Sequence, residues 1–206
     1  MISTQQTFKM NSKELKKYRA NLRTWFRRAT DQDIVDGVYW YEEAQEFSKQ
    51  LSNTFNVSPF RVAAVISALS PANKWSRNKI DTVTVFLAAT NGLEPKDFKV
   101  STYNSNKIKA LRIAKGELNI TDDSPKTYAF AQNIGNMSSD HVTIDRWHLR
   151  ACQTISLKPR DCKMSLTTKQ YKAIQDATVQ VAKEYNLKGY EFQAIVWLSI
   201  KNAWER

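Results

Sequence analysis

Cysteine, glycine and proline are scarce in this sequence of 206 residues, and each scarcity excludes a class of protein. The two cysteines, Cys152 and Cys162, are too few for a disulfide framework or for an iron–sulfur cluster held by four thiolates. Five glycines and five prolines are too few for a β-sandwich, whose short strands need frequent turns. The composition therefore argues against a disulfide-rich domain and against a β-sandwich.

Histidines and long apolar runs are also lacking. The two histidines, His141 and His148, are too few to indicate a metal site, so we expect no metal and no cofactor. The first residues, MISTQQTFKMNSK, contain no apolar signal core, and the best apolar run, VAAVISAL, is too short to span a bilayer. We expect a soluble cytoplasmic protein with no membrane partner, in the cytoplasm of the host cell if the protein is viral.

Basic residues, by contrast, are abundant and unevenly distributed. The chain has 31 Lys and Arg against 20 Asp and Glu, a net charge of +11. Residues 1–30 carry eight basic and one acidic residue, residues 31–60 carry one basic and six acidic, and residues 61–116 carry ten basic and three acidic. Separated basic blocks are typical of proteins that bind a polyanion, and nucleic acid is the first candidate, although a Lys-rich surface also keeps a protein in solution.

Apolar residues recur at helical spacing through most of the chain. The pattern predicts an all-α fold of about eight or nine helices, with little or no β-sheet. The central helix near residues 59–69 should be buried, with Ser58 as its N-cap and Pro59 as its first residue. We expect Gly116 to end one helix and Thr167 or Thr168 to cap another. The expected helices cover residues 12–29, 38–55, 59–69, 76–90, 103–116, 126–134, 146–155, 167–186 and 190–204.

The helix over residues 12–29 has one apolar face, and basic residues cover much of the rest. The apolar stripe is expected to pack on the protein. The basic side either follows a phosphate backbone or is solvated. Its members are Lys13, Lys16, Lys17, Arg19, Arg23, Arg27 and Arg28.

Three stretches carry polar groups for which a purely structural protein has little need. The first is LSPANKWSRN at residues 69–78, which follows the central helix. Its basic and aromatic residues suit unstacked bases, unless Trp75 folds back into the core. The second is DDSPKTYAFAQNI at residues 122–134, in which Ser124 and Pro125 mark a helix start. Lys126 then lies in the first turn, where the helix macrodipole disfavours a cation, so this lysine is either functional or solvated.

The third such stretch is HVTIDRWHLR at residues 141–150. A short β-branched run interrupts the helical patterns and leads to Asp145, which directly precedes the next helix. Asp145 should accept backbone N–H bonds there and stay ionised. It is either a simple N-cap or a catalytic carboxylate that stabilises a developing cation or positions water. The two roles are compatible, because a cap fixes the geometry of the carboxylate.

The order of these stretches resembles the helix-hairpin-helix DNA glycosylase superfamily, of the endonuclease III type. The resemblance covers about residues 58–155 and includes the spacing of 19 positions between Lys126 and Asp145. Where that family has a Leu-Pro-Gly-x-Gly hairpin, this chain has NITDDSPK, which indicates a divergent branch. Divergent glycosylase-like proteins of this kind also occur in phages, where some relatives are implicated in making hypermodified thymines. The matching positions are Leu69, Ser70, Asn78, Lys79, Tyr103, Asn104, Ser105, Lys126, Asp145 and Arg150.

The resemblance implies one all-α domain over residues 1–206 with two lobes and a cleft between them. The glycosylase-like core would span about 58–155, with helices 12–29 and 167–204 completing the second lobe. A flipped base would enter the cleft. The sequence leaves the oligomeric state undetermined. Asp145 would stabilise an oxocarbenium-like transition state at the sugar, and Lys126 would be either a Schiff-base nucleophile or a positioning cation.

The alternatives to a glycosylase are base hypermodification chemistry of the phage type on the same fold, or a catalytically inactive protein that binds DNA or a host protein.

The resemblance also implies the remaining functional residues. Residues expected to contact the substrate are Ser70, Asn73, Lys74, Trp75, Asn78, Trp147, His148 and Gln193, and those expected on the DNA backbone are Arg77, Lys79, Lys107, Arg146 and Arg150.

Overall fold

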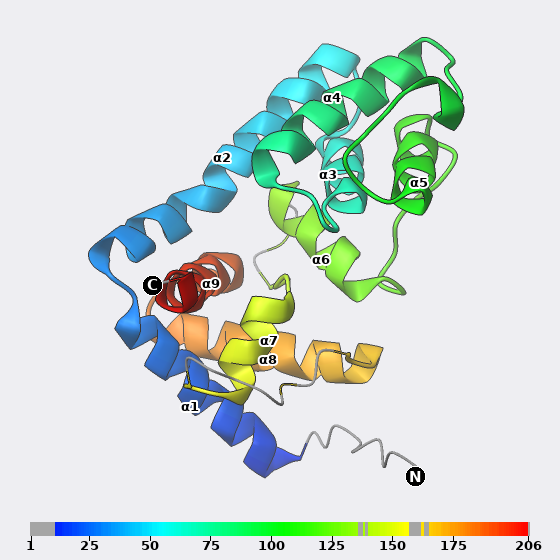
Figure 1. Ribbon diagram of the computed structural model, residues 1–206. Helices are drawn as coiled ribbons and strands as arrows, with labels where there is room; N and C mark the ends of the chain where they lie inside the picture. The colour runs from blue at the N-terminus through cyan, green and yellow to red at the C-terminus, as the bar shows by residue number, and fades with distance from the viewer. Residues whose placement is uncertain (1–10, 136–137, 139, 157–161, 163–164, 206) are drawn as a thin grey trace. The chain divides into compact units, whose positions relative to one another are not determined.

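The computed structural model describes residues 11–135, 138, 140–156, 162 and 165–205, and Figure 1 shows their helices. These residues form α-helices and one short 3-10 helix, η1, and they contain no strand. The predicted all-α fold is therefore confirmed. The elements are α1 (Ser12–Arg28), α2 (Asp31–Phe55), α3 (Pro59–Leu69), α4 (Trp75–Thr90), η1 (Pro95–Asp97), α5 (Asn104–Ala114), α6 (Pro125–Ile134), α7 (Arg146–Gln153), α8 (Thr168–Glu184) and α9 (Gly189–Glu205).

The described chain divides into two compact units. The first unit contains the residues up to Trp40 and those from Ile144 onward, and the second contains Tyr41–Thr143. Helix α2 contributes its first residues to the first unit and the rest to the second. The expected single domain with a cleft between two lobes stays a prediction.

The start of α2 differs most from the sequence-based expectation. The helix begins at Asp31, whereas we expected it at residue 38. Thr30 and Asp33 explain the early start, because they cap the helix reciprocally. The Asp33 N–H donates to Thr30 Oγ1 at 3.1 Å, and the Thr30 N–H donates to Asp33 Oδ2 at 2.9 Å. Asp33 is also buried and accepts a 2.6 Å hydrogen bond from Asn202.

The first unit is built around α1, which packs against α7, α8 and α9. The fully buried Trp25 joins three of its elements. Its ring nitrogen donates to the Thr154 carbonyl at 2.8 Å, and its own carbonyl accepts from Ser199 Oγ at 2.8 Å. Helix α2 approaches α9 closely at Gly37, where an added Cβ would lie 2.5 Å from the Ile195 side chain. These contacts fix the helices that carry Asp145 and its neighbours.

The second unit is built around α3, whose residues Val62–Leu69 are all buried. Helices α4, α5 and α6 pack around it. The predicted central buried helix is therefore confirmed, and so is its N-cap, because the Ser58 hydroxyl accepts from the Arg61 N–H at 3.2 Å. Helix α3 positions the loop that leads into α4.

Two other predicted helix ends are also confirmed. Gly116 has a φ of 80°, and the Gly116 and Glu117 N–H groups bond the carbonyls of Ile113 and Arg112 at 3.0 and 2.9 Å, which ends α5. Thr167 caps α8 with Gln170 as its reciprocal partner. None of the helices in the described ranges is long and apolar enough to cross a membrane.

Candidate functional site

Asp145 occupies the N-cap position of α7, directly after the buried residues Val142–Ile144. Its backbone is extended, with φ −90° and ψ −176°, and its Oδ1 accepts from the His148 N–H at 2.8 Å. The side chain is half-buried. The predicted cap is therefore confirmed, and it holds the carboxylate in one orientation at the positive end of the helix.

Helix α8 supports Asp145 through Tyr171. The Ile144 N–H donates to the Tyr171 hydroxyl oxygen at 3.0 Å, which fixes the residue before the cap. Burial and the negative charge of Asp145 both raise the pKa of Tyr171. The phenol therefore stays protonated at neutral pH, and it lies within electrostatic range of the Asp145 carboxylate.

His148 ties α7 to α8 from inside the protein. Its ring is fully buried, and Nε2 lies 2.9 Å from Thr178 Oγ1, whose hydroxyl donates to the Ile174 carbonyl. Because the Thr178 hydrogen is already used, we infer that Nε2 carries the ring hydrogen and donates. Burial lowers the pKa of His148 to about 3, so the ring is neutral at pH 7. A fully buried ring has no surface to offer a substrate in this conformation.

Trp147 and Arg150 lie on α7 and meet Trp204 of α9. The guanidinium carbon of Arg150 is 4.8 Å from the centre of the Trp147 ring and 5.4 Å from the centre of the Trp204 ring. The two indoles stand edge to face, with centroids 5.8 Å apart. We call these three residues the tryptophan–arginine cluster. It brings together two predicted residues and one, Trp204, that the sequence did not single out.

The other two predicted residues of this unit differ in exposure. Arg146 is exposed in the first turn of α7. Gln193 lies on α9 and is only 5% exposed, so its side chain lies in the protein interior and not on the surface. The first unit thus gathers Asp145, Arg146, Trp147 and Arg150 at one helix.

In the second unit, the loop between α3 and α4 is fastened from both sides. Ser70 Oγ donates to the Ser67 carbonyl at 2.9 Å, and the Pro71 carbonyl accepts from Thr102 Oγ1 at 2.9 Å. Directly after these two anchors, Ala72 has a φ of 57°, a left-handed conformation that is costly for a residue with a Cβ. Such local strain persists only where the surroundings impose it, and it occurs often in functional loops.

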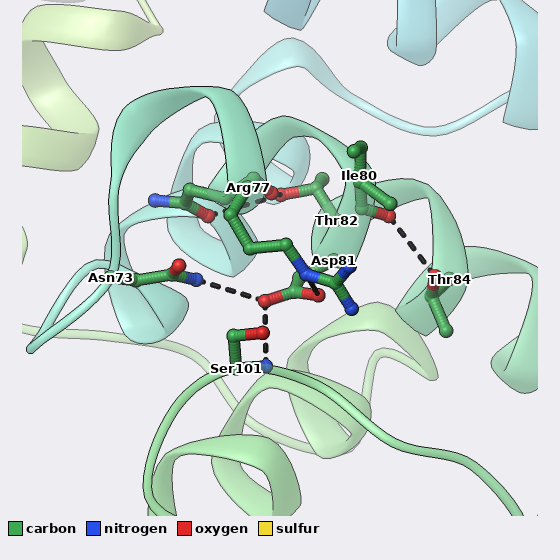
Figure 2. Close-up of polar contacts among 8 residues, drawn as sticks. Asn73, Arg77, Ile80, Asp81, Thr82, Thr84 and Ser101 are labelled. Carbon is green, nitrogen blue, oxygen red and sulfur yellow. Dashed lines mark hydrogen bonds and ion pairs between the residues drawn. The ribbon is translucent and has the colours of Figure 1, made fainter.

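Asp81 is the main anchor of this loop, as Figure 2 shows. Its carboxylate is fully buried and accepts from Asn73 Nδ2 at 2.9 Å, from the Ser101 N–H at 2.8 Å and from Arg77 Nε at 2.9 Å. Three donors compensate for the desolvation of the charge. Asn73 and Arg77 are therefore used to hold the loop, while Lys74 between them is exposed.

Trp75, Asn78 and Lys79 also contact the protein. The Trp75 ring packs edge to face on Phe47, with centroids 6.2 Å apart, which agrees with a partly buried core position. Asn78 is buried and donates to the Ile66 carbonyl at 3.0 Å. Lys79 pairs with Glu43 at 2.9 Å. These three residues stabilise the start of α4, whatever else they contact.

The two remaining predicted lysines lie in different surroundings. Lys107 donates to the Pro95 carbonyl at 2.6 Å and to the Phe98 carbonyl at 3.3 Å, so it holds the segment around η1. Lys126 is exposed in the first turn of α6 and has no ion pair or hydrogen bond from its side chain to any described residue. Ser124 is the N-cap of that helix, as predicted, but its side chain makes no capping bond.

Sequence reasoning missed four residues of these sites: Asp81, Tyr171, Thr178 and Trp204. The sequence does contain a signal for Asp81, because Arg77 lies one helical turn before it, at a spacing that favours an ion pair. The other three come from α8 and α9 and act on α7 across long sequence separations. Among the described residues, no group of three or more His, Cys, Asp or Glu side chains could hold a metal ion.

The comparisons with known proteins identify a family and no activity. Residues 4–204 match the profile of DUF7178, which is described as a family of unknown function. No match was found among curated proteins or among solved structures. Because the matched range covers nearly the whole chain, the protein belongs to the family DUF7178.

Proposed function

We propose that this protein is a DNA base-processing enzyme, similar to a DNA glycosylase, in which Asp145 is the catalytic carboxylate. One observation carries the proposal. Asp145 is a half-buried carboxylate that the His148 N–H holds at 2.8 Å at the start of α7, and the next residue of the chain is the exposed Arg146. A fixed carboxylate followed by an exposed arginine suits a reaction in which positive charge develops on a sugar that is bound through phosphate.

The chemistry would follow the logic of glycoside hydrolysis. Asp145 stabilises positive charge at C1′ of the sugar as the bond between C1′ and the base nitrogen breaks. The base leaves with the bonding electrons and is protonated, while a water molecule loses one proton and forms the new C1′–O bond. The capping His148 N–H keeps the carboxylate oriented, and the buried phenol of Tyr171 fixes the preceding residue, Ile144.

The charge of the chain supports DNA as the partner. The net charge is +11, and Lys13, Lys16 and Lys17 are exposed on α1. Exposed lysines of this kind neutralise phosphates and raise affinity for nucleic acid of any sequence. The glycosylase-like reaction and its phage-type alternative, chemistry on the base itself, both need such a partner.

The test of the proposal is Asp145→Asn. Asparagine is as good an N-cap as aspartate, so the fold should keep its melting temperature while turnover falls at least 100-fold. Turnover is measured by mass spectrometry of nucleosides and released bases after incubation with several DNAs, including DNA from the protein's own genetic context. Asp176→Asn, which changes an exposed carboxylate of α8 in the same unit, is the matched control.

Full activity of Asp145→Asn would reject Asp145 as the catalytic group. Salt-dependent DNA binding by the wild type with no change in any base would instead favour an inactive DNA-binding module. Lys126 is tested in the same samples with borohydride, which traps a Schiff base as a covalent DNA adduct. An adduct that disappears in Lys126→Ala, while Lys96→Ala keeps it, would assign Lys126 as the nucleophile.

A further inference from the structure

The tryptophan–arginine cluster holds a cation without an acidic partner. Among the described residues, the Arg150 side chain makes no ion pair and no hydrogen bond, and its Nε is buried without an acceptor. Its guanidinium carbon lies 4.8 Å from the centre of the Trp147 ring and 5.4 Å from the centre of the Trp204 ring. Cation–π contacts orient a guanidinium and leave its charge unneutralised, so Arg150 is prepared to bind an anion.

The neighbouring side chains repeat the same combination of indole and cation. Lys201, three residues before Trp204 on α9, lies 4.8 Å from the centre of the Trp197 ring. No Asp or Glu occurs in residues 146–153 or 192–204, and the acids that flank these ranges near the site are Asp145, which caps α7, and Glu205, the exposed last residue of α9. The paired elements α7 and α9 therefore carry cations and indoles without a competing carboxylate inside either stretch.

We propose that the tryptophan–arginine cluster, together with Arg146 and Lys201, is a binding site for single-stranded DNA. Arg150, Arg146 and Lys201 bind successive phosphates, and an unpaired base stacks on Trp204. The proposal rests on the proposed function for its choice of DNA, and it adds the class of substrate, an unpaired strand.

The exposure of Trp204 selects the single strand over the duplex. The Trp204 side chain is 38% exposed, so part of its indole is open to a further ring. Each base in the interior of a duplex is already stacked on both faces, whereas an unpaired base offers a free face to an aromatic ring. Alternating cations and aromatic rings are the combination that proteins use to bind single strands without reading their sequence.

The test is fluorescence anisotropy of a labelled thymidine 12-mer with the full chain, at several salt concentrations. Trp204→Ala should weaken binding roughly tenfold, the usual effect of removing one base–aromatic stack. Arg150→Met keeps the stem between the two indoles and removes the charge, so it should also lower the salt slope by about 0.7. The matched controls are Tyr39→Ala, which removes an aromatic side chain that is 59% exposed, and Lys172→Met on α8. Melting temperatures exclude misfolded variants.

The outcomes separate this site from the catalytic proposal. Affinity of Trp204→Ala and Arg150→Met within twofold of wild type would overturn the site, and so would equal or tighter binding of a duplex or of an RNA 12-mer. If base processing still depended on Asp145 in that case, the proposed function would survive alone. Weakened binding in both variants, together with no change in any base by the wild type, would support the binding site and reject the proposed enzymatic activity.

Discussion

His148 is a fully buried titratable residue, and its burial has a consequence for stability. The ring is fully buried, bonds Thr178 through Nε2, and has no described partner for Nδ1. A protonated ring would need an acceptor on Nδ1, and burial alone lowers its pKa to about 3. The folded protein therefore cannot take up the proton that the unfolded chain accepts near pH 6.5.

Stability should consequently fall as the pH drops below 6.5. Between about pH 3 and pH 6.5 the unfolded state binds more protons than the folded state, so the free energy of unfolding rises with pH in that window. From pH 7 to pH 5 the loss due to His148 is about 2 kcal/mol, which urea unfolding at the two pH values would measure.

His148→Gln is the control for this effect, because glutamine can still donate to Thr178 but does not titrate. The variant should be less stable at pH 7, and its stability should change less between pH 7 and pH 5 than that of the wild type. An unchanged pH dependence in the variant would show that other groups dominate. His141, whose pKa burial also lowers, would be the first of these.

At the scale of single elements, local chemistry predicted several helix ends correctly, but the start of α2 was not among them. Ser58, Gly116 and Thr167 act at the predicted ends because capping depends on a few neighbouring residues. The start of α2 was missed, although Thr30 and Asp33 carry a capping signal, because acids and a glycine at position 37 are typical of a loop.

In the candidate sites, contacts between near neighbours in the chain could be predicted, and contacts between distant residues could not. The N-cap role of Asp145 could be predicted, because it involves only the next three residues of the chain. The contact of Arg150 with Trp204 and the bond from the Ser101 N–H to Asp81 could not, because each joins residues that packing alone brings together. Sequence reasoning therefore found the residues at helix starts and missed the partners that hold them.

Gly37 offers a test of packing at the element scale. Alanine is the better helix former by about 1 kcal/mol, so helix propensity alone predicts that Gly37→Ala stabilises α2. The structure predicts the opposite, because the new Cβ would lie 2.5 Å from Ile195 Cγ1 and 2.7 Å from the Ile195 backbone nitrogen. Overpacking against a backbone should destabilise the protein by about 1–3 kcal/mol, measured by urea unfolding.

Lys49→Ala is the matched change for Gly37→Ala, because Lys49 is an exposed interior residue of the same helix. It should alter the free energy of unfolding by no more than about 0.5 kcal/mol. If Gly37→Ala proved as stable as the wild type, α2 and α9 would have to be less tightly packed at this point than described.

On the scale of the whole molecule, the net charge of +11 is the dominant feature, but its cations are not equivalent. On α1, Arg23 bonds Glu184 at 2.7 Å, Arg19 bonds Gln180 at 3.0 Å and Arg28 bonds the Ile155 carbonyl at 2.7 Å. These arginines are used within the first unit. The exposed lysines of the same helix have no such partners among the described residues, so they remain for a polyanion.

For the proposed DNA partner, the triple variant Lys13→Gln, Lys16→Gln, Lys17→Gln should therefore weaken binding and lower its dependence on salt. Each lost phosphate contact removes about 0.7 from the slope of log affinity against log salt for a single strand, so the slope should fall by about 2. A second triple variant, Lys169→Gln, Lys172→Gln, Lys183→Gln, removes the same charge from exposed positions of α8. Equal effects of the two variants would mean that the overall charge attracts DNA. A larger effect of the first would identify the basic side of α1 as the surface that follows the phosphate backbone.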